Sequence, residues 1–81
     1  MNQPIRSTLP LAMAGEGARV RMIGMSGTQR VAHRLAELGL TTGAAMKVLR
    51  DNGGTLLIAV GDTRLALGSS VAHTVLVSLL D

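Results

Sequence analysis

Residues 26–43 read SGTQRVAHRLAELGLTTG, and this stretch holds the clearest local structural signal in the chain. Val31, Leu35 and Leu38 recur at intervals of four and three residues, which places them on one face of an α-helix. Gly39 follows as a residue that readily adopts the left-handed conformation in which helices commonly end. The stretch therefore predicts one amphipathic helix that ends at Gly39.

Both ends of this helix are expected to be capped by local interactions. Ser26 is the expected N-cap, because Gln29 three residues later can complete a capping box with it. At the other end, Leu40 is expected to pack on Leu35 in a Schellman ending.

The residues on both sides of the helix have the patterns of short β-strands. Alternation of apolar and polar residues, or a short apolar run rich in β-branched residues, predicts a strand. The predicted strands are residues 18–24, 44–51, 55–60, 63–67 and 75–80. The run at 55–60 is nearly all apolar, which predicts a central strand buried on both faces.

Turns and short helical turns separate these strands. Residues 52–54 (Asn-Gly-Gly) predict a tight hairpin, because glycine adopts the positive φ angles that such turns need. Residues 61–62 (Gly-Asp) predict a second turn. Residues 9–13 are expected to form one helical turn, and Ser69 is expected to cap another through residues 70–73.

This order of elements predicts a mainly β fold: a small, partly open barrel of about five strands, with one α-helix inserted after the first strand and short helical turns. Residues 9–81 are expected to form this single domain, and residues 1–8 a flexible N-terminal leader. The sequence has no Phe, Trp or Tyr, so aliphatic side chains must fill the core. The expected core is Val20, Met22, Val31, Leu35, Leu38, Val48, Ile58, Leu65, Leu67, Val75 and Val77.

The amino-acid composition limits the kinds of site and of binding partner that the protein can have. The 81 residues include eight Lys or Arg and five Asp or Glu, for a net charge of +3, and the arginines are dispersed along the chain. The lack of cysteine excludes disulfides and zinc–thiolate sites. No run of eighteen apolar residues and no signal-peptide pattern is present, so we expect a cytoplasmic protein without direct membrane insertion.

Enzyme activity is not expected, and no cofactor is predicted. The candidate nucleophiles are Ser26, Ser69, Ser70 and Ser78, of which Ser26 and Ser69 are better explained as helix caps. Asp51 and Asp62 fall in turns, where Asp is common. No glycine-rich stretch is followed by the Lys and Ser/Thr of a P-loop. Without aromatic side chains, the chain lacks the platforms for stacking bases or for holding proline-rich peptides. No nucleic acid partner is expected, which leaves protein surfaces.

Three segments together resemble the FeoA (ferrous iron transport protein A) family. They are residues 17–24 (GARVRMIG), residues 34–43 (RLAELGLTTG) and residues 65–77 (LALGSSVAHTVLV). Their order and spacing match the family's pattern over nearly the whole chain. One departure is Thr42, where the family usually has proline, and this change loosens a turn without altering the topology.

The resemblance implies an SH3-like barrel that acts in bacterial ferrous iron uptake. Members of the family are thought to act with a FeoB-like membrane transporter, so the implied role is that of an accessory or regulatory protein on its cytoplasmic side. A similar module forms the C-terminal domain of repressors of the diphtheria toxin repressor family. The alternative is therefore a stand-alone interaction or regulatory domain in a metal-dependent repressor system.

The candidates for a metal site are few. His33 and Glu37 lie one helical turn apart and could face one ion, and His73 is the remaining histidine. A transition-metal site needs three or four ligands. We therefore expect His33 and Glu37 to be an exposed helical pair and predict no metal site in the monomer; an ion between two molecules is the alternative.

The surface predicted to bind a partner protein is the exposed face of the helix, formed by Arg30, His33, Arg34 and Glu37. The alternative is that these residues only solvate the helix. Met25 and Leu40 would either extend this surface as an apolar patch or belong to the core. Weak self-association is also expected, because a small open barrel leaves strand edges that can pair with a second chain.

Overall fold

The computed structural model describes residues 8–80. Except for Thr8, the leader expected at residues 1–8 lies outside the described residues. The strands are β1 (Leu9–Pro10), β2 (Arg19–Met25), β3 (Ala45–Asp51), β4 (Thr55–Val60), β5 (Thr63–Gly68) and β6 (Val75–Leu79). The helices are the 3-10 turn η1 (Leu11–Met13), α1 (Gln29–Glu37) and α2 (Ser69–Ala72).

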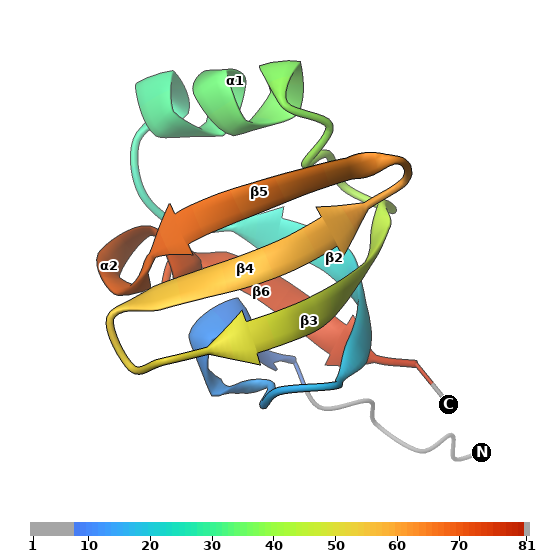
Figure 1. Cartoon of the computed structure of the whole chain (residues 1–81). Coiled ribbons are helices and arrows are strands. Elements are labelled where there is room, and N and C mark those ends of the chain that lie inside the picture. The colour runs from blue at the N-terminus through green and yellow to red at the C-terminus, as the bar shows by residue number, and fades with distance from the viewer. Residues whose placement is uncertain (1–7, 81) are drawn as a thin grey trace, which may run out of the picture.

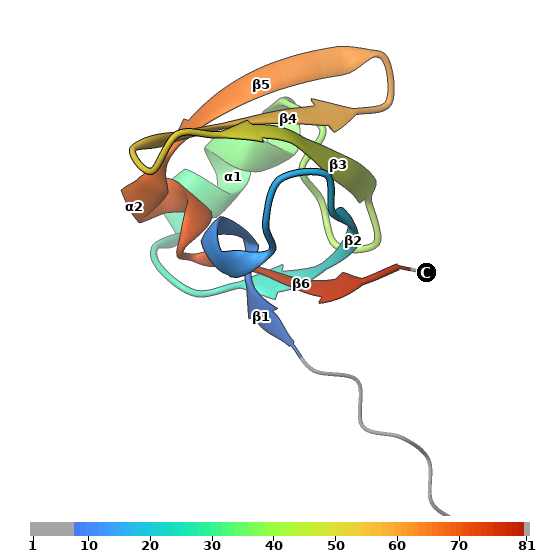
Figure 2. The same ribbon diagram turned by 60° about the horizontal axis from the view of Figure 1, so that its bottom comes forward.

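The strands form one antiparallel sheet in the order β1-β6-β2-β3-β4-β5, which curls into an open barrel. Figure 2 shows β3, β4 and β5 as one layer over β2 and β6. This confirms the expected SH3-like, mainly β fold, with six strands instead of about five. The additional strand comes from residues 9–13: Leu9 and Pro10 pair with β6, and the helical turn begins only at Leu11.

Two bulges bend the long strands so that the sheet can curl. The register between β2 and β6 shifts between Met22 and Gly24, and the register between β3 and β4 shifts between Val48 and Arg50. A bulge inserts one extra residue and increases the local twist. The outermost long strand, β5, pairs with β4 on one side only, so it forms a free edge of the sheet.

The core is aliphatic, as composition requires, but its membership differs from the expectation. The buried hydrophobic residues are Leu11, Val20, Met22, Leu35, Leu40, Met46, Val48, Leu56, Ile58, Leu67, Ala72, Val75 and Val77. Leu38 was wrongly expected in the core and is 44% exposed, and Val31 and Leu65 are only partly buried. β4 buries Leu56 and Ile58 on one face and only half-buries the other, because no element covers the outside of the barrel.

The C-terminal end of α1 confirms the predicted Schellman ending. The Gly39 N–H donates to the Ala36 carbonyl at 3.0 Å, and the Leu40 N–H donates to the Leu35 carbonyl at 2.9 Å. Gly39 has φ +98°, a conformation that costs glycine little. This ending turns the chain so that Leu40, which is 1% exposed, enters the core. Leu40 therefore takes the place that the helical spacing had predicted for Leu38.

The predicted caps at the starts of both helices are wrong. The N-cap of α1 is Thr28, whose Oγ1 accepts from the Val31 N–H at 3.2 Å. Ser26 instead donates its N–H to the Thr74 carbonyl, so the chain is still leaving β2 at that point. Ser69 is the first residue of α2, because Gly68, with an extended backbone, is the N-cap and no side chain caps this helix. The Ser69 N–H donates to the Gly54 carbonyl at 2.9 Å.

The exchange between Leu38 and Leu40 gives the first testable prediction. Leu40→Ala should lower the free energy of unfolding by about 2–5 kcal/mol, because it empties a fully buried leucine site. Leu38→Ala, a matched deletion on the exposed side of the same helix end, should lower it by less than about 1 kcal/mol. Urea unfolding of both variants measures the difference, and equal losses would contradict the observed core.

Candidate functional site

Helix α1 lies outside the sheet at one side of the barrel (Figure 1). Its attachment is narrow: Leu35 is its one fully buried side chain, and Val31 packs at the edge of the core. At its C-terminal end it approaches β4, since a Cβ added to Gly39 would lie 3.7 Å from Cγ1 of Val60. Most of the helix surface is therefore available to a partner.

The four predicted partner-binding residues of α1 are all exposed, as required by that role. Nδ1 of His33 lies 3.6 Å from Oε2 of Glu37, with 79% and 66% of the two side chains exposed. This is an ion pair only when the imidazole is protonated, and at such exposure it contributes a few tenths of a kcal/mol at most. Arg30 and Arg34 stand one turn apart on the same helix and are also exposed.

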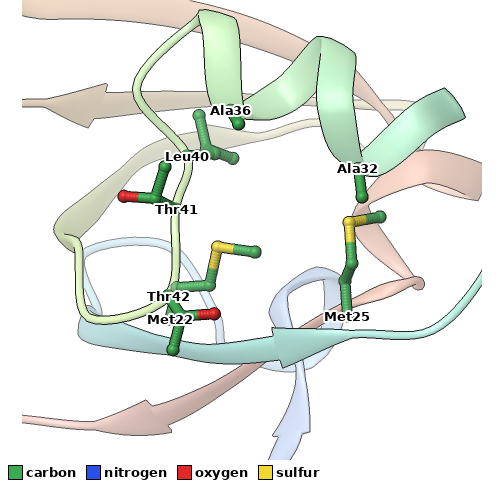
Figure 3. A pocket seen from close by; sticks show the side chains of 7 residues that line it. All are labelled: Met22, Met25, Ala32, Ala36, Leu40, Thr41 and Thr42. Atoms are coloured by element: carbon green, nitrogen blue, oxygen red, sulfur yellow. The ribbon is translucent and has the colours of Figure 1, made fainter. Parts of the chain in front are cut away.

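A cavity of about 220 Å³ lies between α1 and β2. In Figure 3, Met22 and Met25 extend from β2 toward the helix, and Ala32 and Ala36 face them from above. The two small alanine side chains leave the space open, and long flexible methionines can adapt to what enters it. Leu40, Thr41 and Thr42 complete the lining.

The cavity is continuous with the charged face of the helix. A shallow depression next to it is lined by Gln29, Arg30, Ala32 and His33, so Ala32 borders both hollows. Of the two residues with alternative roles, Met25 is half-buried in the cavity wall and Leu40 belongs to the core. An apolar hollow beside exposed arginines is suited to a protein partner, which needs both kinds of contact.

The three metal candidates do not come together. His73 belongs to the end of α2, where its Nδ1 lies 2.8 Å from the Ser69 carbonyl. Within residues 8–80, no group of three or more His, Asp or Glu side chains could hold an ion. His33 and Glu37 thus provide at most two ligands on an exposed helix, which is fewer than a transition-metal site requires.

Asp51 and Asn52 have a structural role at the β3–β4 hairpin. Asp51 accepts the Gly53 N–H at 2.9 Å, and Asn52 accepts the N–H groups of Gly54 and Thr55. Gly53 has φ +90°, as expected for this turn. These bonds fix the hairpin.

A cationic face on the outside of the sheet was not among the predictions from the sequence. Arg19 of β2 is the cross-strand partner of Lys47 of β3, Lys47 is the partner of Ala59 of β4, and Ala59 is the partner of Arg64 of β5. Arg21 and Arg50 are exposed on the same strands. The alternation of apolar and polar residues in each strand indicates that these cations point outward. Only the register between the strands shows that they are neighbours.

Comparisons with known proteins agree with the fold. The FeoA domain family model matches residues 9–79. A protein of Methanocaldococcus jannaschii named "Putative Fe(2+) transport protein A" is 29% identical over 68 residues, which cover 84% of this chain and 83% of that protein. The crystal structure of an iron uptake regulatory protein (FeoA) is 32% identical, with a TM-score of 0.85, and covers 91% of this chain and 100% of that one.

A manganese-dependent transcriptional repressor also has this fold. It superimposes with a TM-score of 0.83 at 21% identity, over 95% of this chain and 44% of the repressor chain. At that level of identity the similarity concerns the fold alone.

The arrangement of the histidines gives the second prediction. Calorimetric titration of the chain with Zn(II), and with Fe(II) under anaerobic conditions, should show no submicromolar binding, because His33 and Glu37 offer too few ligands. The control is His33→Ala, which should titrate in the same way as the parent. Submicromolar binding that disappears in His33→Ala would contradict this reading of the site.

Proposed function

The chain belongs to the FeoA domain family, and from that membership we propose that it is an accessory protein of ferrous iron uptake that acts by binding a FeoB-like membrane transporter. The contact would lie on the cytoplasmic side of that transporter. No helix among residues 8–80 is long and apolar enough to span a membrane. Binding between proteins, not catalysis, is the proposed mode of action.

The observation that carries the proposal is the division of α1 into two sides. Leu35 fixes the helix to the barrel, while Arg30, Arg34, His33 and Glu37 remain exposed. Arginine is enriched in protein interfaces, because its planar guanidinium can pair with a carboxylate through two hydrogen bonds. Two arginines one turn apart therefore favour an acidic surface on the transporter as the partner.

The cavity beside the helix supplies the apolar part of the same contact. Interfaces combine a desolvated centre with a polar rim, and most binding energy comes from a few anchors that fill pockets. An aliphatic side chain of the partner could enter between Met22, Met25 and Ala32 while its carboxylates meet the arginines. Such an arrangement needs no bound metal and no nucleotide in this chain.

The fold shared with the repressor favours a second candidate, a regulatory domain that acts in a metal-dependent repressor system. The two functions differ in the consequence of losing the α1 surface. Loss of transporter binding should lower iron uptake directly, whereas the second function should lower the DNA occupancy of a partner repressor and change uptake only indirectly.

The third prediction tests the α1 surface. The double variant Arg30→Glu with Arg34→Glu should lose co-purification with a detergent-solubilised FeoB-like transporter, because it places acidic groups where the partner requires cations. Both side chains are exposed, so the free energy of unfolding should change by less than about 1 kcal/mol.

The matched control is Lys47→Glu with Arg64→Glu, which changes the net charge by the same amount on a different face. In detergent this control should co-purify like the parent. Recovery of the α1 variant at the parent level would move the interface elsewhere. Failure of the parent chain itself to bind would reject the transporter as the partner.

A further inference from the structure

On the outer face of β2–β5, two residues of like charge lie directly opposite each other. Arg19 and Lys47 are direct cross-strand partners, so their Cβ atoms are held about 4.5–5.5 Å apart. Like charges in this position destabilise a sheet. The chain keeps this unfavourable pair although an acidic residue at either position would relieve it, which points to a use for the charges.

The cations form a row whose spacing is set by the backbone. Neighbouring strands lie about 4.7–4.9 Å apart. Lys47 is one strand from Arg19 and two strands from Arg64, so the row extends over roughly 15 Å. Arg21 and Arg50 flank it on the same face. Only Arg30 and Arg34, among the Lys and Arg residues that the structure describes, lie elsewhere.

Among the residues that the structure describes, the acidic groups near this row lie in turns or at a strand end, and none forms an ion pair with it. The outward positions of β2–β5 carry no Asp or Glu, and the one ion pair within 4.0 Å in residues 8–80 is His33–Glu37 on α1. Glu16, in the turn before β2, accepts the Asp51 N–H at 2.9 Å. Asp62 lies in the β4–β5 turn. In Figure 1 the outer face of β3, β4 and β5 faces the viewer, and no other helix or strand of residues 8–80 covers it.

We propose that this face binds peripherally to the phosphate headgroups of an anionic lipid surface. Lys47, Arg50 and Arg64 extend from the layer formed by β3–β5, and Arg19 borders this layer as the cross-strand partner of Lys47. Each cation near an anionic leaflet strengthens binding by roughly fivefold. Such contact needs no fitted groove and no insertion into the hydrocarbon. The residues between the charges on this face are Ala45, Ala59, Ala66 and the half-buried Leu57.

The composition of the face favours lipid over the other anionic partners. A protein interface has an apolar, desolvated centre, whereas here Lys47 lies in the middle of the face, with small Ala45 and Ala59 beside it. Double-stranded DNA is read by a helix or a two-stranded ribbon that enters the major groove, and a curved four-stranded surface does not fit there. Single strands need aromatic platforms, which the chain lacks.

The lipid surface is distinct from the proposed transporter contact and does not depend on it. The row lies on the outer face of β2, β3 and β5, while the transporter contact lies on α1 and on the cavity that α1 forms with β2. Both could be occupied at once, and contact with the bilayer would then raise the effective concentration of the protein at a membrane-embedded partner.

The test is flotation of the full chain with vesicles. Vesicles of phosphatidylglycerol and phosphatidylcholine should carry the protein at about 0.1 M salt and release it at about 1 M, where the Debye length is only about 3 Å. Vesicles of phosphatidylcholine alone should carry none. The variant Lys47→Glu with Arg64→Glu should bind at least about 25-fold more weakly, since two contributing cations are lost.

The matched control is Arg30→Glu with Arg34→Glu, which has the same net charge but an intact row, and it should stay within about fivefold of the parent. If both variants lose binding equally, net charge alone is responsible and the assigned face is wrong. Absence of a preference for anionic vesicles in the parent also overturns the proposal. The proposal is also overturned if the parent binds a short DNA duplex more tightly than it binds anionic vesicles. It is likewise overturned if Lys47→Glu with Arg64→Glu loses co-purification with the transporter while its vesicle binding is unchanged.

Stability gives an independent readout. Lys47→Glu alone replaces a like-charge pair with an opposite-charge pair beside Arg19, so its thermal midpoint should rise while vesicle binding falls. A lower midpoint would contradict the claim that the row is kept at the expense of stability. If the variant with both charges reversed does not fold, Lys47→Gln with Arg64→Gln repeats the binding test without introducing acidic groups.

Discussion

Strand β3 is hydrogen-bonded to β2 on one side and to β4 on the other, so that Met46 lies opposite both Val20 and Val60. This double pairing joins the two layers of the barrel. It directs Met46 and Val48 inward, into a core that has no aromatic side chain, and it directs Lys47 outward. The curl of the sheet, the closed core and the row of external charges all follow from the register of this strand.

Two local signals in the sequence were reliable because the structure at those places is also local. The end of α1 at Gly39 and the hairpin at 52–54 depend on φ angles and hydrogen bonds within a few residues, and both were predicted correctly. Ser26 was assigned the wrong role because its N–H is taken by Thr74, which is far along the chain. Leu40 replaced Leu38 in the core because the Schellman turn, not the helical period, directs the side chain there.

The candidate site was predictable only in part, for a related reason. Exposure of Arg30 and Arg34 follows from the helical period, but the adjacent cavity forms between α1 and β2 and needs the tertiary fold. The cationic face is a stronger case, because Arg19 and Lys47 are 28 positions apart in sequence and 17 separate Lys47 from Arg64. These charges are dispersed in the sequence, and the register of the paired strands makes them neighbours.

The free edge of β5 has a consequence for how the protein behaves when concentrated. An unpaired strand offers its backbone groups to any second strand, and chains that leave such an edge bare tend to aggregate. Here the edge carries the exposed cation Arg64 near its start, and the strand ends at Gly68, where α2 begins. Two copies that tried to join along β5 would bring their guanidinium groups toward the same seam. A charge at this position disfavours the growth of long edge-to-edge assemblies, while the weak self-association expected from the sequence stays a prediction.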